Sequence, residues 1–141
     1  MEKSLKNIFV PSALKLAETP VLAFAFLGDA VHTLAVRTKL LESGFTQANN
    51  LHKNASKVCS SLGQSKMLDE IAPLLTEEEK DIVRRARNTK THKPPKNSGL
   101  EEYKKATALE CLLGWLIATE NFARLEELLN LGLKNIKEKI C

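Results

Sequence analysis

The stretch LAFAFLGDAVHTLAVRTKLL, residues 22–41, is the part of the sequence that determines the expected fold. From Val21 to Val31 every residue is apolar or small except one carboxylate, Asp29, which directly follows Gly28. Surface helices carry a polar face, whereas this stretch is apolar nearly all round, so we expect a helix in the centre of the fold. An ionised Asp in apolar surroundings is strongly destabilising unless another group pairs with it, so Asp29 is expected to have a partner.

A second stretch, ATALECLLGWLIA at residues 106–118, has the same character and carries Glu110 as its one charged residue. Gly114 lies one turn after this acid, much as Gly28 lies beside Asp29, and two helices approach closely where side chains are missing. We therefore expect the two helices to pack together with the two acids a few ångströms apart. No basic residue lies within one helical turn of either acid. A divalent cation would resolve their repulsion, and two carboxylates with waters commonly hold Mg²⁺.

Each acid taken alone also fits another interpretation, in which it is exposed at a groove or caps a neighbouring helix. A single acid of this kind is about as often structural as functional. Because the pattern occurs in both long apolar helices, metal binding is the favoured interpretation.

The whole chain of 141 residues has the pattern of one all-α domain, residues 1–141, with few Gly and Pro and no alternating strand pattern. Thr19 and Pro20 are typical of the N-cap and first position of the long helix. Thr76 and Glu79 form a capping box for the helix that follows them. The predicted helices cover residues 12–17, 19–43, 46 onward, 64–75, 76–88 and 98–119, with one or two more in 122–140.

The composition excludes some classes of protein. Lys and Arg number 21 against 17 Asp and Glu, a net charge of +4 that by itself names no partner. The longest apolar run is shorter than the ~20 residues of a membrane span and is not placed like a signal peptide, so no membrane association is expected. The three cysteines lack metal-site spacing and are interpreted as reduced thiols of a cytoplasmic protein.

Basic residues gather between positions 84 and 96, with no acid among them. Ordinary compensation of a helix dipole accounts for the first arginines but not for the Lys-, Asn- and His-rich loop that follows, whereas phosphate binding accounts for both. Aromatic residues are absent from this run, so a double-helical backbone is a better partner than stacked single-stranded bases. The residues predicted to contact this phosphate backbone are Arg84, Arg85, Arg87, Asn88, Lys90, Lys93, Lys96, Asn97 and Lys104.

These motifs together resemble a known family. Residues 22–41 resemble the signature helix of ribonuclease III enzymes, and RRARNTKTHKPPKN (84–97) with YKKATALECLLGWLIATE (103–120) is similar to the second acidic motif of the Mini-III branch. Over roughly residues 19–128, the resemblance implies an all-helical homodimer without a double-stranded-RNA-binding domain. Such an enzyme hydrolyses double-stranded RNA with Mg²⁺, or Mn²⁺ in its place. The typical substrate of the branch is the paired stem of precursor large-subunit (23S-type) ribosomal RNA.

Carried over by position, Asp29 and Glu110 are the catalytic acids and metal ligands, and Phe26 lies at the dimer interface or, alternatively, in the core. Other acids of the full-length enzymes are missing, as in the Mini-III branch, so waters and RNA phosphate oxygens must complete the metal shell. His32 replaces an aromatic residue of the branch and is interpreted as a packing residue. Two rival functions remain open: a non-catalytic helical RNA-binding dimer, and a metal enzyme acting on small nucleotides.

Overall fold

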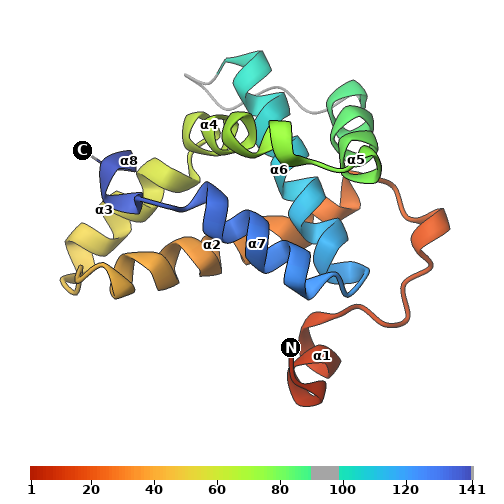
Figure 1. Cartoon of the computed structure of the whole chain (residues 1–141), viewed down its shortest axis with the longest axis horizontal. Coiled ribbons are helices and arrows are strands. Elements are labelled where there is room, and N and C mark those ends of the chain that lie inside the picture. The colour runs from red at the N-terminus through yellow and green to blue at the C-terminus, as the bar shows by residue number, and fades with distance from the viewer. Residues whose placement is uncertain (90–98, 141) are drawn as a thin grey trace.

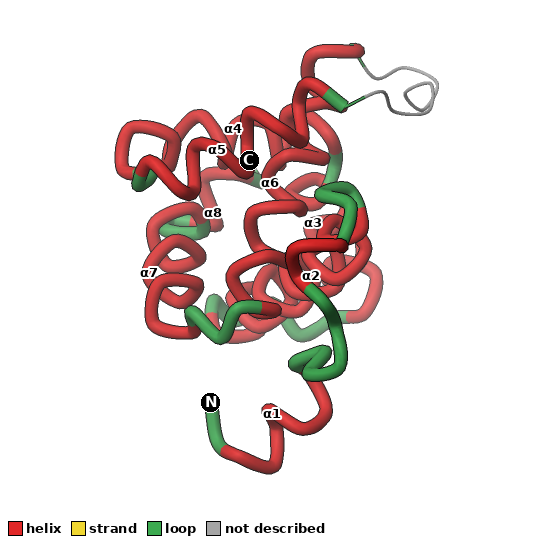
Figure 2. The backbone as a smooth tube through the Cα atoms, turned by 90° about the vertical axis from the view of Figure 1, so that its right-hand side faces the viewer, coloured by secondary structure: helices red, strands yellow, loops and turns green. Residues whose placement is uncertain are grey.

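The computed structural model describes residues 1–89 and 99–140, and this part of the chain is built from helices without any strand (Figures 1 and 2). The all-α prediction is therefore confirmed. None of its helices combines the length and the hydropathy that a membrane crossing requires. The α-helices are α1 (Lys3–Phe9), α2 (Ala23–Glu42), α3 (Ala48–Cys59), α4 (Ser61–Ile71), α5 (Glu77–Asn88), α6 (Leu100–Ala118), α7 (Phe122–Gly132) and α8 (Ile136–Lys139), with short 3₁₀-helices at Leu16–Glu18 and Ala72–Leu74.

Helix α6 is the centre of the fold, as its sequence predicts. Helices α2, α4, α5 and α7 all pack against it (Figure 1). Its side chains are buried around most of the helix circumference, including Leu109, Leu112 and Leu113 at 0% exposure. An all-round apolar helix is stable only where neighbours cover every face, which is the position that α6 has.

Helix α2 differs from the expectation of all-round burial. Its buried residues form one stripe at every fourth position, which is the spacing of one helix face: Phe24, Gly28, His32, Val36 and Leu40. Other apolar side chains of the same helix are exposed, and Phe26 reaches 91% exposure. The prediction was wrong because α6, α3 and α8 cover only one side of α2, which leaves an apolar surface on the other side.

The two glycines of the apolar helices permit the contact between α2 and α6. A Cβ atom added at Gly28 would lie 1.7 Å from the backbone oxygen of Glu110, and one at Gly114 would lie 1.9 Å from the backbone oxygen of Phe24. No side chain fits at these separations, so the backbones touch as the sequence predicts. This contact fixes the position of Glu110 relative to α2.

The N-terminal segment also differs from the prediction. Residues 12–15 are not helical, and the helix lies earlier, at α1, which both views show apart from the main bundle (Figures 1 and 2). An ion pair of 2.5 Å between Lys6 and Glu120 joins α1 to the turn after α6. Thr19 does not cap α2, because its hydroxyl donates to the carbonyl of Lys15 and residues 20–22 form a turn before the helix begins at Ala23.

The capping box at the start of α5 is confirmed, and it takes part in a tertiary contact. The Thr76 hydroxyl accepts from the Glu79 backbone N–H, and the Glu79 carboxylate accepts from the Thr76 backbone. Both oxygens of this buried carboxylate also accept hydrogen bonds of 2.8 Å from Arg124 of α7. Burial alone would raise the pKa of Glu79, but the bonds to Arg124 and Thr76 outweigh it and hold this pKa below its usual value.

Candidate active site

The contact between α2 and α6 brings the two predicted acids together. The side chains of Asp29 and Glu110 are hydrogen-bonded to each other. Glu110 is partly buried, whereas Asp29 is exposed on the surface of α2. The pair therefore lies at the rim of the helix contact, open to solvent, and not in the interior that the apolar sequence around Asp29 suggested.

The electrostatics of this carboxylate pair favour a bound positive charge. Burial raises the pKa of Glu110 to about 8, and the hydrogen bond and charge of Asp29 act in the same direction. A hydrogen bond from Gln64 opposes them by stabilising the ionised form. Neither acid has an ion pair with Lys or Arg in the part of the chain that the structure describes. Near neutral pH the pair therefore retains a proton, which a cation would displace.

The donor set fits a hard cation held with few protein ligands. Two carboxylates supply oxygen ligands, and within residues 1–89 and 99–140 no cluster of three or more His, Cys, Asp or Glu side chains forms a fuller set. Mg²⁺ is commonly bound in this way, because it keeps several waters and takes substrate phosphate oxygens as further ligands. Asp29 and Glu110 are thus the residues that would hold it.

Two buried polar residues lie behind the pair. Gln64, in the first turn of α4, is 3% exposed, and its Nε2 atom lies 3.3 Å from Nδ1 of His32. Burial lowers the pKa of His32 to about 4, so its ring is neutral and fully enclosed, in agreement with a packing role. Sequence reasoning missed Gln64. The available signal was its place at helical spacing with Leu68, Ile71 and Leu75, which makes it a polar residue on an apolar face.

The predicted basic residues that the structure describes gather at a second place. Arg84, Arg87, Asn88 and Lys104 line a depression between α5 and the start of α6. Arg85 is exposed and lies outside this depression. The predicted contacts Lys90, Lys93, Lys96 and Asn97 fall outside the described residues.

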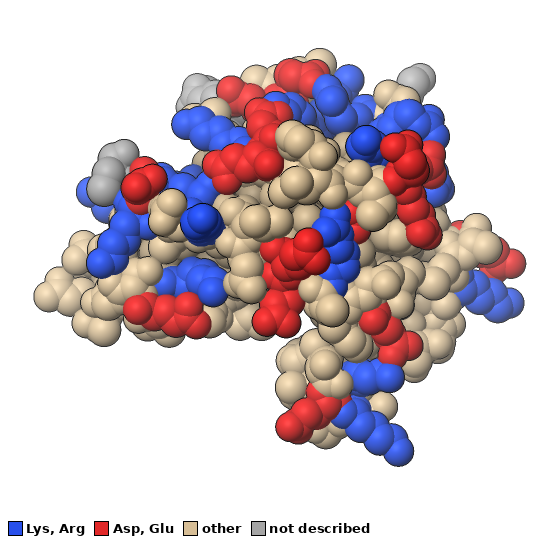
Figure 3. All heavy atoms as spheres, viewed as in Figure 1, with Lys and Arg blue, Asp and Glu red and all other residues tan. Residues whose placement is uncertain are grey.

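Acids partly neutralise this basic surface, which the run of sequence from 84 to 96 did not indicate. Arg84 pairs with Asp81, one turn earlier on α5, and Arg87 pairs with Glu101 at the start of α6. On the face seen in Figure 3, basic side chains are likewise interleaved with acidic ones. A phosphate group must therefore compete with these carboxylates for the arginines.

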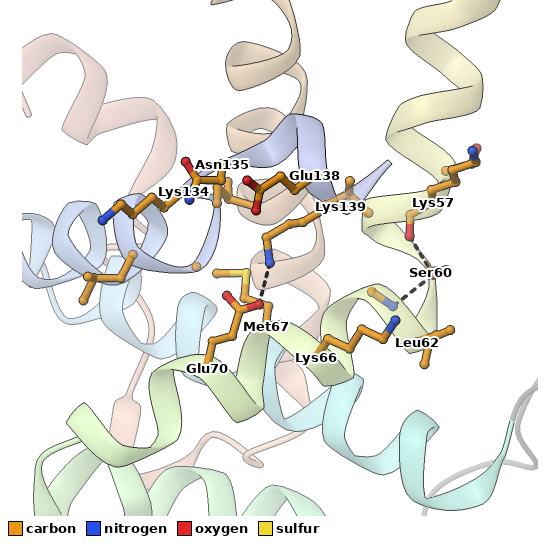
Figure 4. Close-up of a pocket in the computed structure, with 16 residues that line it drawn as sticks. Lys57, Ser60, Leu62, Lys66, Met67, Glu70, Lys134, Asn135, Glu138 and Lys139 are labelled. Carbon is orange, nitrogen blue, oxygen red and sulfur yellow. Dashed lines mark hydrogen bonds and ion pairs between the residues drawn. The ribbon is translucent and has the colours of Figure 1, made fainter. Parts of the chain in front are cut away.

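A wide cavity of about 900 Å³ lies elsewhere, between α3, α4 and α8 (Figure 4). Its lining carries both signs of charge, and Lys139 pairs with Glu70 across 2.8 Å. Neither Asp29 nor Glu110 lines it. The cavity is therefore separate from the carboxylate pair, and its mixed charge does not favour a phosphate chain.

Phe26 does not belong to the core. It lies one turn before Asp29 on the exposed face of α2, at 91% exposure. An apolar groove runs beside it, with Ile8, Phe9 and Leu14 of the N-terminal segment in its lining. The alternative of a plain core residue is therefore wrong, and an apolar surface adjoins the carboxylate pair.

Comparison with known proteins identifies the family. The profile of the Ribonuclease III domain matches residues 22–121, the segment from α2 to α6 that contains both acids. The chain belongs to the ribonuclease III family. As a member of this family, it is an endoribonuclease of the ribonuclease III type.

The relatives of this ribonuclease III protein match it over most of their length. A mini-ribonuclease 3 from Thermoanaerobacter is 39% identical over 98% of this chain and 100% of its own. One from Symbiobacterium thermophilum is 41% identical over 78% of this chain and 85% of its own. A crystal structure of a protein from Fusobacterium nucleatum superposes with a TM-score of 0.75 at 32% identity, covering 84% of this chain and 95% of that one.

Proposed function

We propose that this ribonuclease III protein cuts double-stranded RNA in a reaction that requires Mg²⁺, with Asp29 and Glu110 as metal ligands and catalytic acids. The observation that carries the proposal is the pair itself: two carboxylates in contact, open to solvent and without a basic partner among the described residues. An arrangement of this kind is stable near neutral pH only with a shared proton or a cation.

The residues of the chain have distinct parts in this reaction. Asp29 and Glu110 lie at the rim of the α2–α6 contact, where they would hold the cation beside the scissile phosphate. When bound there, Mg²⁺ supplies an activated water and offsets charge on the leaving oxygen. Mn²⁺, which also takes oxygen ligands, would replace it.

The substrate is a duplex, and the protein binds the phosphate groups of its backbone. Arg84, Arg87 and Lys104 converge on one depression with the amide of Asn88, and these are groups that donate to phosphate oxygens. Among the described residues, no aromatic side chain lines this depression. Stacking of unpaired bases, which single-strand binding uses, is therefore not supported there. The biological substrate we propose is the paired stem of precursor 23S-type ribosomal RNA in the cytoplasm, which the resemblance to the Mini-III branch implies.

The protein acts as a homodimer in this proposal. Phe26 and the groove beside it form an exposed apolar surface, and such surfaces are typical of contacts between protein chains. A second copy seated on this surface would place two carboxylate pairs near each other, because Phe26 lies one turn from Asp29. Two basic surfaces would then act together on one duplex.

The decisive experiment is cleavage of a fully paired RNA with Mg²⁺ by wild type, Asp29→Asn and Glu110→Gln. We expect cutting by the wild type, and binding without cutting by both variants. Wild-type binding without cleavage would favour the non-catalytic alternative, and strong competition by free nucleotides would favour a small-molecule substrate. Cleavage that survives either substitution removes that acid from the site.

Binding should depend steeply on salt, because phosphate contacts release counterions. Arg87→Ala should weaken binding to all duplexes alike and reduce the salt slope by ~1. Lys53→Ala is a matched control, because Lys53 is an exposed basic residue of α3 outside the depression. An equal effect of the two substitutions would contradict the assignment of the basic surface.

A further inference from the structure

The first turn of α4 contains Gln64. Hydrogen bonds to Ser60 and a backbone contact with the end of α3 fix the position of this turn. The Ser60 hydroxyl accepts the backbone N–H of Gly63 at 3.0 Å, and the Gln64 backbone N–H donates to the Ser60 carbonyl at 2.9 Å. A Cβ atom at Gly63 would lie 2.4 Å from the backbone oxygen of Val58, so α4 begins in direct backbone contact with the end of α3. The Gln64 side chain therefore leaves a backbone whose position is closely fixed.

The Gln64 carboxamide contacts two partners. Its Nε2 atom lies 3.3 Å from His32 Nδ1, and its hydrogen bond to Glu110 favours the ionised carboxylate, as an N–H donor does. A carboxamide nitrogen carries two hydrogens, so the same group is able to donate to both the ring and the acid. Rotation of the amide would remove its N–H from the buried His32 ring, so this contact favours one orientation of the carboxamide.

The position of His32 favours the contact with Gln64 but leaves the other ring nitrogen of His32 without a hydrogen-bond partner in the described part of the chain. Its ring is 0% exposed, and Nδ1 accepts from Gln64, so the proton of the neutral ring lies on Nε2. That Nε2 atom has no hydrogen-bond partner among the described residues. A buried N–H without a partner is destabilising, so an apolar residue would suit the core better at this position. What His32 supplies is an acceptor that holds the Gln64 amide.

We propose that Gln64, oriented by His32, is a positioning residue that holds the Glu110 carboxylate toward Asp29 for cation binding. This inference rests on the proposed function of the carboxylate pair. Glu110 has no Lys or Arg partner in the described structure, so without Gln64 its flexible side chain would sample other rotamers at the solvent-open rim. Groups that orient a metal ligand typically change metal affinity or activity 10–100-fold when they are removed.

Direct metal binding gives the first test, without RNA or turnover. Binding of Mn²⁺ alone is measured by electron paramagnetic resonance for wild type, Gln64→Leu and Ser65→Ala. Ser65 is a matched control, because it is 4% exposed in the same turn and takes no part in the Glu110 interactions. We expect Gln64→Leu to weaken Mn²⁺ binding about 10-fold or more, with Ser65→Ala close to wild type.

Two variants of His32 separate positioning from packing. The side-chain oxygen of His32→Asn provides an acceptor close to the place of Nδ1, whereas His32→Leu provides none. We expect His32→Leu to weaken Mn²⁺ binding about as much as Gln64→Leu, and His32→Asn to weaken it less. Circular dichroism and thermal melting on the same samples show whether each variant is folded.

The outcomes distinguish the two proposals. If wild type binds Mn²⁺ and cuts duplex RNA while folded Gln64→Leu does both equally well, the positioning role of Gln64 is wrong and the proposed function stands. Equal Mn²⁺ affinity of His32→Asn and His32→Leu removes His32 from the proposal. If wild type neither binds Mn²⁺ at the pair nor cuts duplex RNA, the proposed function itself fails.

Discussion

Replacing Glu110 by glutamine should stabilise the metal-free protein at alkaline pH. The pKa of Glu110 is raised from 4.5 to about 8, so the folded state keeps a proton that the unfolded state releases at lower pH. Wherever the folded state binds more protons, stability falls as pH rises. The free energy of unfolding of the wild type should therefore decrease between about pH 4.5 and pH 8, and Glu110→Gln should lack this decrease.

The size of the effect follows from the shift. A change of one in pKa corresponds to about 1.4 kcal/mol, so the rise from 4.5 to about 8 sets an upper limit of about 5 kcal/mol. Solvent reaches this rim and screens the charges, so we expect a difference of about 2–3 kcal/mol between pH 5 and pH 9. Millimolar Mg²⁺ should reverse the loss of wild-type stability at high pH, because a ligand that binds only the folded state stabilises that state.

The measurement is urea unfolding in EDTA at a series of pH values, with Glu126→Gln as a control for removing an exposed carboxylate of α7. Glu126→Gln should keep the wild-type pH dependence. If wild type and Glu110→Gln lose stability in parallel as pH rises, the electrostatic account of the carboxylate pair is refuted.

Three further perturbations test the fold and the assembly. Gly114→Ala should lower the free energy of unfolding by about 3 kcal/mol, because its Cβ would lie 1.9 Å from a backbone oxygen of α2, and a wild-type urea midpoint would contradict this packing. Arg124→Ala should cost about 3 kcal/mol at pH 7, since it leaves Glu79 buried and unpaired. Because Arg124 helps to hold the pKa of Glu79 below its usual value, the difference from wild type should shrink as the pH falls through the acid range, and a constant difference would count against the pairing. Phe26→Asp should convert a dimer to a monomer in size-exclusion chromatography, while Leu62→Asp, at an exposed position of α4, should not; a dimer that survives Phe26→Asp rules out the proposed interface.

The features that sequence reasoning predicted correctly depend on local pattern. An apolar surface around the whole of 106–118 leaves no place for this helix except the centre of the bundle. The capping box at Thr76 and Glu79 is complete within four residues, so no tertiary information is needed to predict it. The glycines at 28 and 114 likewise predicted a close helix contact, because each removes the one side chain that would separate the backbones.

The features that it missed depend on which elements meet in space. The apolar sequence around Asp29 does not say how many sides of α2 are covered, so its exposure was not predictable from the stretch itself. Gln64 contacts Glu110 across 46 positions of sequence, and only the docking of α4 on α6 makes that contact. The compensation of Arg87 by Glu101 arises in the same way, from the packing of α5 beside α6.

The central claim is that Asp29 and Glu110 share a divalent cation, and a crystal grown with Mn²⁺ tests it most directly through the anomalous signal of the metal. We predict a manganese peak within coordination distance of both carboxylates, with waters in the remaining positions. A map in which the metal binds elsewhere, or in which the two side chains turn away from each other in its presence, would contradict the claim.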